Sequence, residues 1–201
     1  MKEVPTSYHT ASQFELSSDS ELCHTYLMTS IPAPLKLRVL ALLVDFVLVL
    51  VYIGILVGVA LSFFYFIIGG IPTLSTNAAH AIGFLTLTLP VATYFILCEL
   101  SQRHASFGKR KAKLIVSSFD GKPLEIKQVI VRNIIKFLPW EYAHTLIYIL
   151  ILVPGATSST PLLFALIVAN IIPLVYVCFV LFRRDHRGPH DLVSGTIVVE
   201  G

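Results

Sequence analysis

The sequence predicts an all-α membrane protein with four transmembrane helices, a small cytoplasmic β-hairpin and an interfacial amphipathic helix. Three observations lead to this prediction: the composition, four long apolar stretches, and the uneven distribution of basic residues. Of the 201 residues, 55% are hydrophobic and 13% are charged, whereas a soluble domain carries about 25% charged residues. This composition favours a protein that lies in a bilayer.

Four apolar stretches can each supply the roughly 20 residues that a helix needs to cross a bilayer. We expect transmembrane helices at residues 35–66, 79–100, 134–153 and 160–182. The third stretch reaches this length only by including charged residues, so its composition alone does not decide whether it crosses.

The basic residues decide the status of the third stretch. All 15 Lys and Arg residues fall within residues 2–38, 103–136 and 183–187, and the connectors 69–77 and 154–159 contain none. Under the positive-inside rule, both termini and the middle loop are then cytoplasmic, in a multi-pass protein of the inner membrane. This arrangement needs an even number of crossings, so the third stretch is predicted to cross.

The cytoplasmic loop at residues 101–133 is predicted to contain a hairpin. Asp120-Gly121 suits a tight turn because both residues tolerate positive φ. We expect residues 114–117 to pair with residues 123–126 across this turn.

An amphipathic helix is predicted to follow the hairpin. Polar residues recur every four positions from Gln128 to Lys136, and isoleucines recur with the same spacing from Ile126 to Ile134. This pattern is typical of a helix that lies in the membrane interface. Pro139 is expected to mark the point where the third crossing begins.

Other segments point to no chemistry of their own. The first 34 residues are rich in Ser and Thr without an apolar period, which predicts a disordered cytoplasmic tail. The three cysteines have neither disulfide nor metal spacing. We find no nucleophile motif, so we expect no enzyme, no catalytic residue, no metal and no cofactor. The basic residues lie between the membrane segments, so their distribution reflects the orientation of the protein in the membrane better than it indicates nucleic-acid binding.

Two opposite charges, Arg38 and Asp45, lie at the start of the first apolar stretch. Positions seven apart on an α-helix differ by about 20° around the axis and by about 10 Å along it, so the two side chains share a face without touching. Arg38 is long enough to reach cytoplasmic phosphates. Asp45 is too short, so it must be neutral, paired with a group on another helix, or beside water.

Further polar residues are predicted to meet these two at the cytoplasmic end. Glu99 closes the second helix, and His190-Asp191 follows the fourth. Because the fork of an arginine can hold two carboxylates, we expect Arg38 to bind Asp191 directly, with Asp45 one to two turns deeper. These five residues form the predicted ion-binding or structural polar cluster.

Weaker candidates lie in the later helices. Glu141-x-x-His144 has the spacing of metal ligands in helical bundles, but a single such motif fits interfacial residues that touch water better than a metal site. Pro90 and Pro173 each free a backbone carbonyl, and Asn170 is beside the second. Freed carbonyls can bind cations in transporters, or the prolines can serve packing alone.

Three motifs together resemble the RDD family of bacterial membrane proteins. They are "LRVLALLVDF" at 37–46, "ASFGKRKAKLIVSSFDGKPLEIKQVIVRN" at 105–133 and "HDLVSGTIVV" at 190–199. The resemblance extends over residues 35–199, including the C-terminal His-Asp segment at 183–199.

The resemblance also assigns the residues for which the family is named. Its arginine matches Arg38, its intrahelical aspartate matches Asp45, and its second aspartate matches Asp191. Its Gly-Lys element matches Gly108-Lys109, preceded here by Ser-Phe where the family usually has Thr-Pro or Thr-Leu. For the family, transport of unidentified ligands has been proposed, and some members resemble cation/proton antiporters.

These observations support three hypotheses. The first is a small transporter that exchanges monovalent cations and protons at Asp45, working as a homodimer because four helices are few for a pathway. The second is an accessory or scaffold protein with a structural polar cluster, whose cytoplasmic loop recruits a partner or anionic lipid. The third, ranked last, is a membrane-embedded enzyme that uses Glu141, His144, His190 and Asp191.

Overall fold

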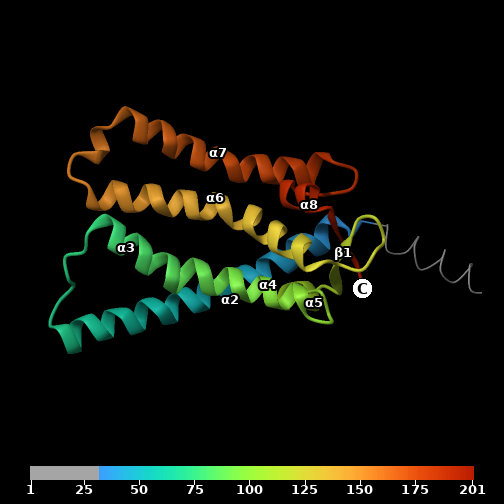
Figure 1. Cartoon of the computed structure of the whole chain (residues 1–201), viewed down its shortest axis with the longest axis horizontal. Helices are drawn as coiled ribbons and strands as arrows, with labels where there is room; N and C mark the ends of the chain where they lie inside the picture. Colours follow the sequence, from blue (N-terminus) through green and yellow to red (C-terminus); the bar gives the residue numbers. More distant parts are fainter. Residues whose placement is uncertain (1–31) are drawn as a thin grey trace, which may run out of the picture.

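Four long helical segments form the molecule (Figure 1). The computed structural model describes residues 32–201, so all but the last three residues of the predicted tail lie outside the described residues. Within that range the long segments are Leu35–Ile68, Thr76–Leu100, Ile126–Leu152 and Thr160–Phe182, each long and apolar enough to cross a membrane. The prediction of an all-α protein with four membrane-spanning helices is confirmed.

Two of the four segments contain π-helical turns. The first consists of α2 (Leu35–Phe63) and η1 (Phe64–Ile68). The second consists of α3 (Thr76–Gly83), η2 (Phe84–Thr88) and α4 (Leu89–Leu100).

The other two segments are single α-helices. They are α6 (Ile126–Leu152) and α7 (Thr160–Phe182), and the short 3₁₀ turn η3 (Ala156–Ser158) lies between them.

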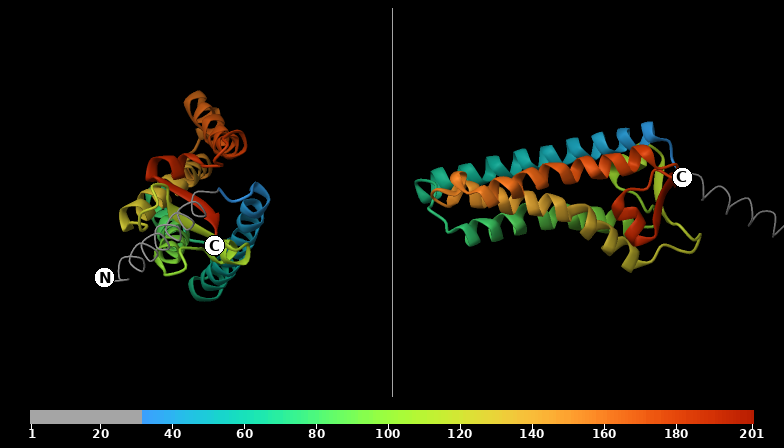
Figure 2. Two further views of the ribbon diagram at one scale, coloured as in Figure 1. Left: turned by 90° about the vertical axis from the view of Figure 1, so that its right-hand side faces the viewer. Right: turned by 90° about the horizontal axis from the view of Figure 1, so that it is seen from above.

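A small cap closes one end of the bundle, on the right in Figure 1 and facing the viewer in the left view of Figure 2. Its elements are α5 (Phe107–Lys111), β1 (Leu114–Ser118), α8 (Pro189–Ser194) and β2 (Thr196–Glu200). We call this the basic end, because the basic residues of the middle loop and the C-terminal segment gather there. The connectors at the opposite end contain no Lys or Arg.

The predicted hairpin is wrong, although a two-stranded antiparallel sheet is present. β1 pairs with β2 rather than with residues 123–126, placing Leu114 opposite Glu200 and Ser118 opposite Thr196. Residues 123–126 begin with a proline, which cannot donate to a strand ladder. β2 offers three consecutive buried apolar residues instead, so pairing with it buries more apolar surface.

The predicted interfacial helix is also wrong as a separate element. The segment that begins at Ile126 continues without a break into the third spanning helix. Gln128 faces the cap, donating to the Ser118 hydroxyl at 2.9 Å and to the Gly195 carbonyl at 3.3 Å, and Arg132 is buried. The polar face of this helix therefore packs inside the protein instead of against lipid headgroups.

A tyrosine satisfies the backbone near Pro90. Proline lacks an amide proton and leaves the carbonyl four residues earlier without its usual donor. Here that carbonyl, on Thr86, accepts a hydrogen bond from the Tyr52 hydroxyl of α2 at 2.5 Å. The freed carbonyl thus serves contact between two helices.

Pro139 repeats this arrangement. It lies well inside α6 instead of in a first helical turn as expected. The carbonyl four residues earlier, on Ile135, accepts a hydrogen bond from the Tyr176 hydroxyl of α7 at 2.8 Å. The two prolines therefore fix where neighbouring helices meet.

Candidate functional site

The carboxylate of Asp45 binds the start of α5. It accepts hydrogen bonds from the Ser106 hydroxyl at 2.5 Å and from the Gly108 amide at 2.7 Å, and only 5% of the residue is exposed. A Cβ atom at position 108 would lie 2.1 Å from the Ala41 carbonyl oxygen, so this close approach requires glycine. Asp45 is therefore satisfied by the cap and forms no ion pair within residues 32–201.

Arg38 joins the start of α2 to two segments near the C-terminus. Its guanidinium donates to the backbone carbonyls of Ala33 at 3.1 Å, His186 at 2.6 Å and Val198 at 2.8 Å. The predicted ion pair between Arg38 and Asp191 is therefore wrong, because these carbonyls occupy the donors of Arg38 and the aspartate pairs with another arginine.

Asp191 pairs with Arg132 of α6. Its Oδ1 binds Nη1 of the guanidinium, and its Oδ2 accepts from the Gly188 amide at 3.1 Å. Burial would raise the pKa of Asp191, but the charge of Arg132 outweighs it and holds the pKa at about 2. Asp191 is therefore a permanent anion at neutral pH.

Glu99 binds the same arginine from the other side. The residue is fully buried; it pairs with the ammonium group of Lys109, accepts from Asn133 Nδ2 at 2.8 Å, and lies 3.3 Å from Arg132 Nε. Burial lowers the pKa of Lys109, and the adjacent carboxylate of Glu99 opposes that shift. Arg132 thus bridges two carboxylates, as we had expected of Arg38.

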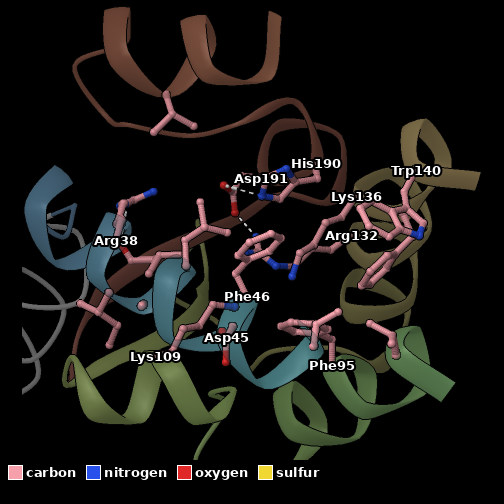
Figure 3. Close-up of a pocket in the computed structure, with 18 of the residues that line it drawn as sticks. Arg38, Asp45, Phe46, Phe95, Lys109, Arg132, Lys136, Trp140, His190 and Asp191 are labelled. Carbon is pink, nitrogen blue, oxygen red and sulfur yellow. Dashed lines mark hydrogen bonds and ion pairs between the residues drawn. The ribbon is translucent and has the colours of Figure 1, made fainter. Parts of the chain in front are cut away.

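We call Glu99, Lys109, Arg132 and Asp191 the ionic cluster. Figure 3 shows His190 and Arg132 pointing toward Asp191. His190 Nε2 lies 3.4 Å from Asp191 Oδ2. Burial and the charge of Arg132 lower the pKa of His190 to about 3, so this imidazole is neutral at neutral pH.

A cavity of about 370 Å³ lies beside the ionic cluster. Its apolar walls come mainly from the four long helical segments, and its polar lining includes Arg38, Asp45, Thr88, Lys109, Arg132, Lys136, His190 and Asp191.

Lys136 differs from the other basic residues that line the cavity. Its Nζ lies 3.6 Å from the centre of the Phe95 ring. Among the residues that the structure describes, it forms neither a salt bridge nor a side-chain hydrogen bond, whereas Lys109 and Arg132 pair with carboxylates and Arg38 donates to three backbone carbonyls. A cation over an aromatic face is stabilised less than one paired with a carboxylate in a buried site.

The family model named RDD matches residues 32–195 of the chain, a range that contains all four spanning segments and the ionic cluster. The chain belongs to the RDD family. This is a family of bacterial membrane proteins. No curated protein and no solved structure matches the chain.

The weaker candidates of this RDD protein lie outside the ionic cluster. Glu141 Oε1 contacts His80 Nε2 at 2.7 Å, whereas His144 packs edge-on against Trp140 with ring centres 4.8 Å apart. Asn170 is exposed and donates to a carbonyl of its own helix at 2.8 Å. Within the described part of the chain, no three His, Cys, Asp or Glu residues gather as metal ligands.

The structure adds residues of the RDD protein that sequence reasoning missed. The amphipathic pattern predicts that Arg132 and Lys136 face the headgroups, and no sequence pattern assigns a role to Ser106 or His80. One signal for Arg132 exists in the sequence: Arg132-Asn133 places two polar residues side by side in a helix that continues into an apolar span. Such a pair needs partners within the protein.

Proposed function

We propose that this RDD protein is a small transporter of the inner membrane that exchanges a monovalent cation for protons through the cavity at its basic end. The observation that carries the proposal concerns Asp45. Of the two carboxylates that line the cavity, Asp191 is paired with an arginine, and Asp45 forms no ion pair among residues 32–201. A carboxylate beside a cavity that no cationic side chain neutralises is the group that an entering cation would bind.

Charge balance supports exchange rather than simple cation binding. The cavity and the ionic cluster together contain four basic side chains and three carboxylates, which are Arg38, Lys109, Arg132 and Lys136 against Asp45, Glu99 and Asp191. The basic side chains thus exceed the carboxylates by one positive charge. At low dielectric this excess charge would repel a cation that enters the cavity. Release of a proton from Lys136, which has no carboxylate partner, removes that repulsion. One cation then enters for each proton that leaves.

The orientation is part of the proposal. Both the start of α2 and the C-terminus lie at the basic end, and the positive-inside rule places that end in the cytoplasm. We further propose a homodimer, because four helices provide few surfaces for a pathway with alternating access.

Proton flux in proteoliposomes tests the proposal. Wild type, Asp45→Asn and Lys136→Met are reconstituted with a pH-sensitive dye inside, and sodium or potassium is added outside. Asparagine keeps one oxygen for the Gly108 amide, and its NH2 group can donate to the Ser106 hydroxyl, but it cannot hold the charge. We therefore expect cation-dependent proton release to fall at least about tenfold. Lys127→Met, on the exposed face of α6, is the control and should transport normally.

A second function, that of an accessory or scaffold protein, is favoured by a specific observation. Arg38 and Asp45 both bind peptide groups of the cap, which is what a structural cluster would do. Exposed basic residues of the cap, such as Arg110 and Lys111, could then recruit an acidic partner or anionic lipid. If the wild-type protein carries no flux, and Asp45→Asn lowers only thermal stability, this second function replaces the first.

A further inference from the structure

A second polar cluster lies inside the bundle, apart from the ionic cluster. It consists of His80, Thr88, Glu141 and Thr145, and we call it the His80–Glu141 cluster. Glu141 Oε1 lies 2.7 Å from His80 Nε2, and its Oε2 accepts from the Thr88 hydroxyl at 2.6 Å. The Thr145 hydroxyl lies 3.1 Å from the same imidazole nitrogen. Both oxygens of this carboxylate on α6 are thus contacted by side chains of the second spanning segment.

The cluster reaches toward the end of the bundle opposite the basic end. His80 lies in α3, four residues after the start of the second spanning segment at Thr76, which corresponds to about 6 Å of helix. The side chain of His80 is 35% exposed and that of Glu141 is 21% exposed. The imidazole is therefore partly exposed about one helical turn from that end, and the carboxylate is less exposed.

Thr88 connects this cluster with the cavity. The residue is buried and lines the cavity of about 370 Å³ while donating to Glu141. A hydroxyl can accept one proton while it donates another. His80, Glu141 and Thr88 therefore form a continuous polar route from the opposite end to the cavity that contains Asp45.

Close helix packing holds the route in place. A Cβ atom on Gly83 would lie 2.0 Å from the Tyr148 hydroxyl oxygen, so the Tyr148 side chain of α6 lies in its present place against α3 because position 83 is glycine. Tyr148 also packs edge-on against His80, with ring centres 5.7 Å apart. His144 of α6 lies near enough to interact electrostatically with both members of the pair.

We propose that the His80–Glu141 cluster binds protons from the side of the membrane opposite the basic end and delivers them through Thr88 to the cavity. A proton from water adds to the imidazole and carboxylate pair, and the pair returns to its starting charge when the proton moves on to the cavity. No electron or co-reactant is needed. Delivery to the cavity rests on the exchange proposed above, whereas proton binding by Glu141 does not.

Infrared titration of the reconstituted protein tests proton binding. We expect a protonated-carboxyl band that appears as the pH falls and is absent from Glu141→Gln. Glu125→Gln is the matched control, because Glu125 precedes the same helix but is exposed at the basic end; it should keep the band. His80→Asn, which cannot take a proton, should shift the midpoint of the Glu141 titration. Identical pH-dependent spectra for wild type and Glu141→Gln would overturn the proposal.

Flux measurements test the route. Glu141→Gln and Thr88→Val should each lower proton uptake at least about tenfold, and Thr88→Ser, which keeps the hydroxyl, should restore it. If Thr88→Val and Glu141→Gln both carry as much proton flux as the wild type, the route is overturned, even if the infrared titration shows that Glu141 binds a proton. If the wild-type protein itself carries no flux, the exchange proposal fails, and the infrared titration still decides whether the cluster binds a proton.

Discussion

The two polar clusters differ in how completely their charges are paired and buried. Every member of the ionic cluster is buried and faces an opposite charge, and Arg132 faces two. The His80–Glu141 cluster contains a single pair, whose side chains are partly exposed. Buried, fully paired charges lose much stability when one partner is removed, whereas a partly exposed pair can change protonation at small cost. The first cluster is thus suited to holding the cap, and the second to exchanging protons.

Arg132→Met should produce the largest effect, because it leaves Glu99 and Asp191 without their shared partner. Removing one member of a buried ion pair costs about 3–5 kcal/mol. Thermal unfolding in detergent measures the loss, with Lys127→Met on the exposed face of the same helix as the control. Equal stability of the two variants would show that the ionic cluster does not hold the cap.

Gly108→Ala tests the contact between α5 and Asp45. The added methyl group would meet the Ala41 carbonyl oxygen at 2.1 Å, and overpacking of this kind costs about 1–3 kcal/mol. Gly54→Ala is the matched control, because nothing lies within 4 Å of its added Cβ; it should change stability by less than about 1 kcal/mol. The same detergent assay separates the two, and a Gly108→Ala protein as stable as Gly54→Ala would contradict this account of the contact.

His190 gives the basic end a pH dependence. Its pKa is about 3 in the folded protein and 6.5 ordinarily, so below pH 6.5 the unfolded chain gains a proton that the folded protein does not. Stability therefore falls as the pH falls through this window, by about 2 kcal/mol at most down to about pH 5. His190→Gln should flatten this part of the curve of unfolding temperature against pH. A variant with the slope of wild type would remove His190 as its source.

The smallest effect on stability is expected at the opposite cluster. His80→Asn removes one partner of a pair whose side chains are partly exposed, so the loss should be about 1 kcal/mol or less. Thermal unfolding of this variant beside Arg132→Met compares the clusters directly. If His80→Asn lost as much stability as Arg132→Met, the two clusters would not differ in how much they stabilise the fold.

The sequence by itself determined the features of the fold that depend on residues close together in the chain. Runs of apolar residues with the length of a bilayer predict spanning helices wherever they occur, and the four predicted segments are present. The number of crossings also predicts that four polar residues lie at the same end of the bundle. They are Asp45, Glu99, His190 and Asp191. The bounds were less certain: the third helix begins at Ile126, because an amphipathic stretch and a span can form one helix.

Only the tertiary structure decided which groups are partners. Arg38 and Arg132 are both arginines at the basic end, and nothing in their local sequence says which one binds Asp191. Arg38 donates to three backbone carbonyls that lie around it. Arg132 is the arginine that lies beside the two carboxylates. β1 takes β2 as its partner because the strand 80 or so residues away buries apolar side chains that the adjacent proline-led segment cannot match. Such choices depend on competition among segments far apart in the chain.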